Sequence, residues 1–172
     1  LDDYDYQNLD SIRIVPTIFV RNEIFQYNTE KTLEKLADDI SFLIEKRSKN
    51  HNGNVVFKYD EIQIDCDWTL ESKDNYLRFI EAFKKVSNKK LSATIRLHQI
   101  KYFEKTKIPN VNRGVLMYYN MGKIAPDSLN SIYDRDIADR YLSSLKNYPL
   151  PIDIALPIYS WGIHIKDGKT IG

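Results

Sequence analysis

The sequence predicts an α/β fold in which parallel strands and helices alternate along the chain. Apolar residues switch repeatedly between a period of two and helical spacing within 172 residues, as in successive βα units. Three of the expected strands have one aliphatic face and one polar or aromatic face, whereas an open doubly wound sheet is apolar on both faces. This pattern favours a barrel, whose inner face turns polar toward the carboxyl ends of its strands.

Five strands are expected from β-branched and aliphatic runs, namely 11–20, 61–68, 90–100, 114–121 and 151–161. The first of these is expected to be buried. Three helices are expected from apolar residues at helical spacing, namely 28–49, 72–86 and 131–148. Their expected N-cap residues are Asn28 or Thr29, Ser72 and Ser131. Only a weak helix, or none, is expected within 101–113, and the tail predicts a short hairpin that turns at Asp167-Gly168.

The periodicities also assign side chains to faces. The first two helices are expected to bury Leu33, Leu36, Ala37, Ile40, Leu43, Ile44, Tyr76, Phe79, Ile80 and Phe83. The aliphatic strand faces are expected to carry Ile62, Ile64, Cys66, Trp68, Leu91, Ala93, Ile95, Leu97, Ile152, Ile154, Leu156 and Ile158. The opposite faces are expected to carry Gln63, Asp65, Asp67, Thr69, Ser92, Thr94, Arg96, His98, Asp153, Ala155, Pro157, Tyr159 and Trp161.

A complete (β/α)8 TIM barrel needs about 250 residues, and five βα units fill only part of one. Residues 1–172 are therefore predicted to form a single partial TIM-barrel-like domain. The chain starts at Leu1 rather than at Met, so we expect a piece of a longer protein. Either flanking barrel segments lie elsewhere, or the sheet does not close.

Composition excludes several function classes. A net charge of +1 provides no strong field to attract nucleic acid. The single cysteine, Cys66, allows neither an internal disulfide nor a cysteine-based metal site. No apolar run reaches the roughly 18 residues of a membrane span, and no glycine-rich nucleotide loop occurs. We expect no cofactor.

Three motifs resemble those of the family 18 glycoside hydrolases, the chitinase-like barrels. The stretch "QIDCDWT" (63–69) resembles the end of the D-x-D-x-E signature on that family's fourth strand. The stretches "LMYYN" (116–120) and "ALPIYSWG" (155–162) resemble the Met-x-Tyr-Asp motif of the sixth strand and the Pro-x-Tyr motif of the seventh. This order of motifs places strands three to seven of the family's barrel in the chain. The chain also resembles a divergent, poorly characterised group of barrel proteins related to these enzymes.

The resemblance implies a poly- or oligosaccharide site at the carboxyl-terminal mouth of the barrel. Asp65 and Asp67 match the two aspartates before the catalytic acid, and Thr69 stands where the family has its acidic Glu. Met117 and Tyr119 match the sixth-strand pair, with Asn120 replacing the final Asp, and Tyr159 matches the seventh-strand Tyr. Arg96 and Trp161 are further candidates for binding sugar. An extracytoplasmic or cell-surface location is compatible with the resemblance.

Because a threonine hydroxyl is a far weaker acid than a carboxyl group, catalysis would need another acid. Residues two apart on a strand lie roughly 6.6 Å from one another, so Asp65 and Asp67 could couple and raise one pKa. Glu71, Glu23 and His98 are alternatives.

The alternative is that Asp65 and Asp67 form a structural network with Arg96 and His98, although a role in a site is favoured. Two functions therefore remain open, a glycoside hydrolase-like enzyme with a rearranged acid and a catalytically inactive carbohydrate-binding protein. A structural domain of a larger polysaccharide-handling protein is a third.

Overall fold

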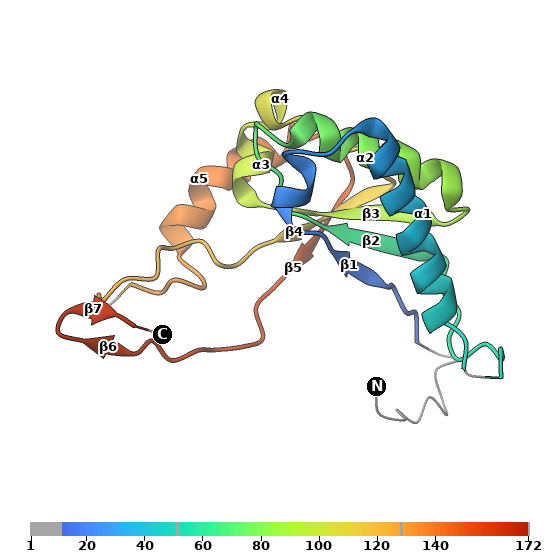
Figure 1. Ribbon diagram of the computed structural model, residues 1–172. Helices are drawn as coiled ribbons and strands as arrows, with labels where there is room; N and C mark the ends of the chain where they lie inside the picture. Colours follow the sequence, from blue (N-terminus) through green and yellow to red (C-terminus); the bar gives the residue numbers. More distant parts are fainter. Residues whose placement is uncertain (1–11, 51, 128, 172) are drawn as a thin grey trace. The chain divides into compact units, whose positions relative to one another are not determined.

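The computed structural model describes residues 12–50, 52–127 and 129–171 and shows a mixed α/β fold with a five-stranded parallel sheet (Figure 1). The strands lie in the order β1-β2-β3-β4-β5. Their bounds are β1 Thr17–Phe19, β2 Glu61–Asp65, β3 Lys90–Ile95, β4 Arg113–Met117 and β5 Ile152–Ala155. The helical segments are η2 Asn22–Phe25, α1 Glu30–Arg47, α2 Lys73–Val86, α3 Leu97–Lys101, α4 Phe103–Thr106 and α5 Arg135–Leu145.

The chain divides into two compact units. The first contains the described residues up to Ala93 together with Pro109–Asn112, and the second contains Thr94–Ile108 and the described residues from Arg113 onward. The single domain expected over 1–172 stays a prediction.

In the first unit, α1 and α2 lie side by side (Figure 1) and pack against each other. All four residues expected to face inward from α2 are fully buried, which confirms that part of the prediction. On α1, Leu36 is only half-buried and Leu43 is 45% exposed, so the buried stripe is narrower than expected. An aromatic core completes the unit, in which Trp68 stacks on Tyr76 with ring centroids 4.5 Å apart.

The apolar face of β2 is also confirmed. Ile62, Ile64, Cys66 and Trp68 are at most 2% exposed, whereas Gln63 and Asp65 are half-buried on the opposite side. Burial of the aliphatic row provides the main stabilisation of this part of the sheet. The alternation of burial continues through Trp68, although the strand itself ends at Asp65.

The first strand is shorter and more exposed than expected. Only Thr17–Phe19 of the range 11–20 is strand, and Ser11 lies outside the described residues. Pro16 has no N–H to donate to a neighbouring strand, although its carbonyl accepts from the Gln63 N–H. The expectation of a buried strand is wrong on one face, because Phe19 is 67% exposed. Its neighbour Val20 is buried.

The expected strand 90–100 is wrong in its second half. β3 ends at Ile95, and α3 begins at Leu97. The Gln99 side chain accepts a hydrogen bond from the Arg96 N–H over 2.8 Å and thereby caps the helix. Arg96 is consequently an N-cap residue, and His98 lies in a helical turn rather than on a strand face.

The strands β4 and β5 pair in parallel, with Gly114 opposite Ile152 and Met117 opposite Ala155. Both are shorter than the expected ranges 114–121 and 151–161, so Tyr119, Tyr159 and Trp161 lie beyond strand ends. The aliphatic row of β5 was expected to pack on helices, but Ile154, Leu156 and Ile158 are 49%, 64% and 101% exposed. That expectation is wrong for the described residues.

Two other boundaries complete the second unit. Asp134, rather than Ser131, caps α5, and its Oδ1 accepts from the Ile137 N–H over 2.8 Å. The Asn130 side chain holds 130–133 in a turn by accepting from the Ile132 N–H, which delays the helix. The tail hairpin is confirmed, with β6 Ile165–Lys166 antiparallel to β7 Lys169–Thr170. Its turn has positive φ angles at Asp167 and Gly168.

Candidate functional site

The aspartates of the "QIDCDWT" motif lie at the end of β2 and just after it. Asp65 is the last residue of the strand and is half-buried, with Phe19 of β1 as its register partner. Asp67 and Thr69 follow the strand and are exposed. The Thr69 N–H donates to the buried Ser72 Oγ over 3.0 Å, and Ser72 Oγ also bonds to Asn22 Oδ1. The motif thus changes from strand to loop between its two aspartates, and hydration lowers the cost of a charge at Asp67.

The other acidic candidates of the first unit are exposed. Glu71 lies in the turn before α2. Glu23 lies in η2, where Arg21 Nε approaches its carboxylate to 3.4 Å. The pKa of the Glu23 carboxyl lies below its ordinary value. The main cause is a hydrogen bond from the backbone of Glu23 itself, and the second is the nearby Arg21. A lowered pKa disfavours the protonated carboxyl that a general acid must supply.

The second unit contains a cluster of aromatic and amide side chains, here called the aromatic cluster and made up of Tyr119, Asn120, Tyr159 and Trp161. The Tyr159 hydroxyl donates to Asn120 Oδ1 over 2.7 Å. The Tyr119 and Tyr159 rings meet edge to face with centroids 5.8 Å apart, and the Tyr159 and Trp161 centroids are 5.6 Å apart. Tyr159 and Trp161 are 42% and 43% exposed, so ring surface is open to a ligand.

The loop that follows β4 positions this cluster. Asn120 has a φ of 55°, a left-handed conformation that asparagine tolerates better than most residues. The chain then returns so that the Gly122 N–H donates to the Ser131 carbonyl over 3.1 Å. Ser131 is only 4% exposed, and its Oγ accepts from Trp161 Nε1 over 3.3 Å. Two side-chain hydrogen bonds therefore anchor the segment after β5 to the loop after β4.

Arg96 and His98 also belong to the second unit, at the beginning of α3. Arg96 is half-buried and His98 is exposed. Asp65, Asp67 and Glu71 belong to the first unit, and the arrangement in which they face one interior with Arg96, His98 and the tyrosines stays a prediction.

Two residues of these sites were missed by sequence reasoning. Ser131 was assigned as a helix cap, whereas its hydroxyl holds Trp161. Phe19 was assigned to a buried strand, although the alternation from Val20 through Ile18 places it on the face of Asp65. Because successive strand residues point to opposite faces, the apolar neighbours Ile18 and Val20 would have assigned Phe19 to the other face of the sheet.

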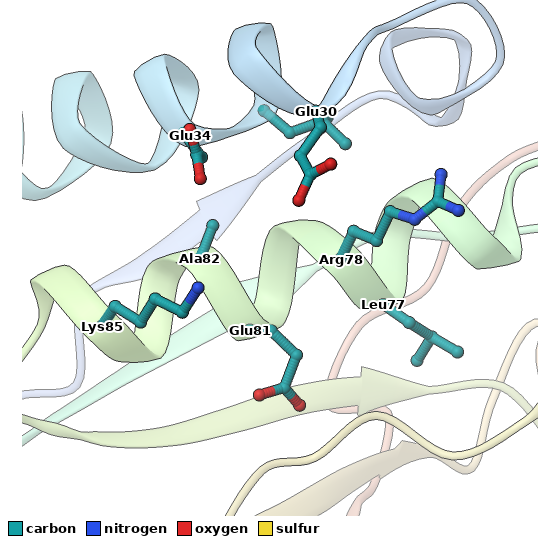
Figure 2. Close-up of a pocket in the computed structure, with 8 residues that line it drawn as sticks. Glu30, Glu34, Leu77, Arg78, Glu81, Ala82 and Lys85 are labelled. Atoms are coloured by element: carbon teal, nitrogen blue, oxygen red, sulfur yellow. The ribbon is translucent and has the colours of Figure 1, made fainter.

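A surface hollow of about 240 Å³ lies between α1 and α2 (Figure 2). Its floor is apolar, and its rim carries Glu30 and Glu34 from α1 with Arg78, Glu81 and Lys85 from α2. The volume is below the roughly 300–1,000 Å³ of ligand pockets, and the charges have both signs. We attribute this hollow to the seam between two solvent-facing helices.

A second hollow of about 370 Å³ lies where α1 and α2 end. Lys89 Nζ lies 5.0 Å from the centroid of the Tyr59 ring, and Lys49 pairs with Glu45. Burial, as the main cause, raises the pKa of Tyr59. Cations at the carboxyl end of a helix stabilise its dipole, which accounts for Lys49 and Lys89 without a ligand.

The described residues include no group of three or more His, Cys, Asp or Glu side chains placed to hold a metal ion. Among the described helices, none is both long and apolar enough to cross a bilayer. Comparisons with protein-family models, curated proteins and solved structures found no match to this chain. The resemblance to family 18 glycoside hydrolases therefore rests on the three motifs and supports only a proposal.

Proposed function

We propose that this protein binds a poly- or oligosaccharide at the carboxyl ends of its parallel strands and is a divergent relative of the family 18 glycoside hydrolases. The observation that carries the proposal is the aromatic cluster. Two partly exposed rings, Tyr159 and Trp161, adjoin each other, and the Tyr159 hydroxyl donates to the exposed Asn120 amide. Flat rings accept the C–H faces of a sugar, and an amide exchanges hydrogen bonds with its hydroxyls.

The position of the cluster after β4 and β5 supports the same proposal. Ligand sites of parallel α/β sheets lie at the carboxyl ends of strands, and Asn120 and Tyr159 both follow such ends. The side chains are also held in place before any ligand arrives, by the hydrogen bonds to Asn120 and Ser131. A preorganised site loses less conformational entropy on binding.

A partial TIM-type barrel is the finer fold that we propose. The exposed row of Ile154, Leu156 and Ile158 supports this, because the corresponding aliphatic face of β2 is buried. In a barrel that face packs against helices. We therefore propose that flanking barrel segments cover this row in the complete protein.

Binding without hydrolysis is the better supported form of the proposal. Thr69 is exposed and provides a hydroxyl where the resemblance calls for a carboxyl. Asp67, the motif aspartate nearer to Thr69, is exposed as well. A hydrolase would have to recruit Asp65, Asp67, Glu71 or His98 as its acid, and a panel of chromogenic glycosides tests that alternative.

The decisive experiment is a glycan array followed by calorimetric titration of the best oligosaccharide. Trp161→Ala should weaken binding by about tenfold, equivalent to about 1.4 kcal/mol. Tyr27→Ala is the control, because Tyr27 is 88% exposed and lies outside the cluster. Absence of any bound glycan, or equal losses in both variants, would refute the proposal.

A further inference from the structure

An exposed aromatic side chain lies at the carboxyl end of β1. Phe19 is 67% exposed, although it belongs to a sheet whose other face is tightly packed. A phenyl ring left in water forgoes the favourable free energy that burial would provide. Its chain neighbour Val20 is 4% exposed, which shows that the backbone here has a defined inner and outer side.

The register between β1 and β2 places Phe19 beside Asp65. Phe19 and Asp65 are Cα partners in the parallel pair, and the Val20 N–H donates to the Asp65 carbonyl over 2.8 Å. Neighbouring strands lie about 4.8 Å apart, and paired residues direct their side chains to the same face. The ring and the carboxylate therefore share one face at the strand ends.

The two parts of the Phe19 ring differ in charge. The face of an aromatic ring is electronegative and its edge electropositive, so a neighbouring carboxylate favours the edge and leaves the face of the ring to another partner. The strand hydrogen bonds also prevent Phe19 from turning to the buried side, where Ile64 and Cys66 lie. A fixed, open ring beside a carboxylate has the two surfaces that a pyranose requires.

We infer that Phe19 and Asp65 form a sugar-recognition point within the first unit, for a pyranose ring of the saccharide bound by this protein. The ring stacks on the axial C–H groups of the sugar, and the Asp65 carboxylate accepts hydrogen bonds from hydroxyls at the sugar's edge. This inference rests on the proposed function, but it uses residues separate from the aromatic cluster.

The test compares Phe19 with an equally exposed phenylalanine of the same unit. Phe42 lies on α1 and is 68% exposed, against 67% for Phe19. Phe19→Ala should weaken binding of the oligosaccharide selected on the array by about tenfold, whereas Phe42→Ala should leave it within about twofold. Phe19→Leu should also bind more weakly than the wild type, because leucine keeps apolar area but loses the flat ring.

A double-mutant cycle with Asp65→Asn measures whether the two side chains act on the same sugar. Coupling of the losses supports one recognition point, and fully additive losses contradict it. Melting temperatures control for folding, and Phe19→Ala should change this temperature by no more than about 2 °C. A large fall in melting temperature with unchanged binding by the folded protein would assign Phe19 to packing and overturn the inference.

The outcomes also separate this inference from the proposed function. If Trp161→Ala weakens binding and Phe19→Ala does not, the proposed site stands and the Phe19 recognition point is wrong. If only Phe19→Ala weakens binding, the Phe19 recognition point stands and the proposed site at the aromatic cluster is wrong. If the wild-type protein binds no oligosaccharide, both are wrong.

Discussion

The Tyr159 hydroxyl donates a 2.7 Å hydrogen bond to Asn120 Oδ1, which joins the segment after β5 to the loop after β4. Asn120 has a second role, because its backbone is left-handed with a φ of 55°. The hydrogen bond to Tyr159 and the left-handed backbone thus depend on the same residue. Substitution separates the two, because glycine adopts the left-handed conformation but has no side chain that could accept the hydrogen bond.

We expect Asn120→Gly to keep the loop conformation and to lose the bond to Tyr159. Its free energy of unfolding should fall by about 0.5–1.5 kcal/mol. Asn120→Ala should cost about 1 kcal/mol more, because alanine is strained in the left-handed region. Urea unfolding of both variants measures the difference. Equal stability of the two would show that the backbone conformation of Asn120 is unimportant.

Gly114 lies where β4 meets two isoleucines. A Cβ at this position would lie 2.6 Å from Ile152 Cδ1 and 2.8 Å from Ile95 Cγ1. We expect Gly114→Ala to lower the free energy of unfolding by about 1–3 kcal/mol, as overpacking does elsewhere. Ile152→Val in the same chain should restore part of the loss by removing the nearer contact.

Gly162→Ala is the matched control for Gly114. A Cβ added at Gly162 meets no atom within 4 Å, so its free energy of unfolding should change by no more than about 0.5 kcal/mol. Thermal unfolding of the three variants is sufficient. A stable Gly114→Ala protein would mean that the isoleucines can move aside.

Ser72 links the end of the Asp65–Asp67 motif to the loop after β1. Its buried Oγ accepts from the Thr69 N–H over 3.0 Å and bonds to Asn22 Oδ1. Ser72→Ala removes both bonds, so we expect a loss of about 1–3 kcal/mol in urea unfolding. Ser143→Ala, at an exposed position of α5, should change stability by no more than about 0.5 kcal/mol.

Helix positions and the alternation of β2 could be predicted because each has a strong local signal. Phe79, Ile80 and Phe83 repeat at helical spacing, and Ile62 and Ile64 repeat at spacing two. Strand ends were predicted less well, because apolar residues continue past them. The aliphatic run through Ile95 and Leu97 gave no indication that Gln99 would cap a helix at Arg96.

The site was predicted only at the level of residue types. Motif spacing identified Tyr119, Asn120 and Tyr159, and the structure brings these three together. Motif spacing could not identify the Ser131 contact to Trp161, because that bond joins positions 30 residues apart through the fold of a loop. Phe19 was missed for a different reason, since a β-branched neighbourhood suggested burial on both faces.

Tyr148 provides a prediction about pH. Its side chain is 7% exposed, its hydroxyl has no hydrogen-bond partner among the described residues, and burial raises its pKa to about 12. The folded state therefore holds this proton more tightly than the unfolded state, whose tyrosines titrate near 10. This stabilisation is fully present below about pH 10 and is lost as the pH rises to about 12.

We expect the free energy of unfolding to fall by about 2–3 kcal/mol across this interval because of Tyr148 alone. Tyr148→Phe should remove that part of the pH dependence. At pH 7 the variant should be as stable as the wild type or more stable, because it no longer buries an unpaired hydroxyl. Urea unfolding at neutral and alkaline pH measures both effects. A large loss of stability at pH 7 would contradict the assignment and reveal a polar partner for the hydroxyl.

Thr69→Glu tests the proposed relationship to glycoside hydrolases most directly. Thr69 is exposed after β2, so a longer side chain meets little steric resistance, and the bond from its backbone N–H to Ser72 Oγ remains possible. If the wild type binds sugar without cleaving it, the new carboxyl should introduce slow hydrolysis of the oligosaccharide that the protein binds. Thr69→Gln is the control, because it has nearly the same shape but cannot donate a proton as a carboxylic acid does. Product formation by Thr69→Glu alone, measured by chromatography, would support descent from an active enzyme. Equal cleavage by the wild type would instead assign the acid to another residue, and Asp67→Asn and Glu71→Gln would then identify which carboxyl supplies the proton.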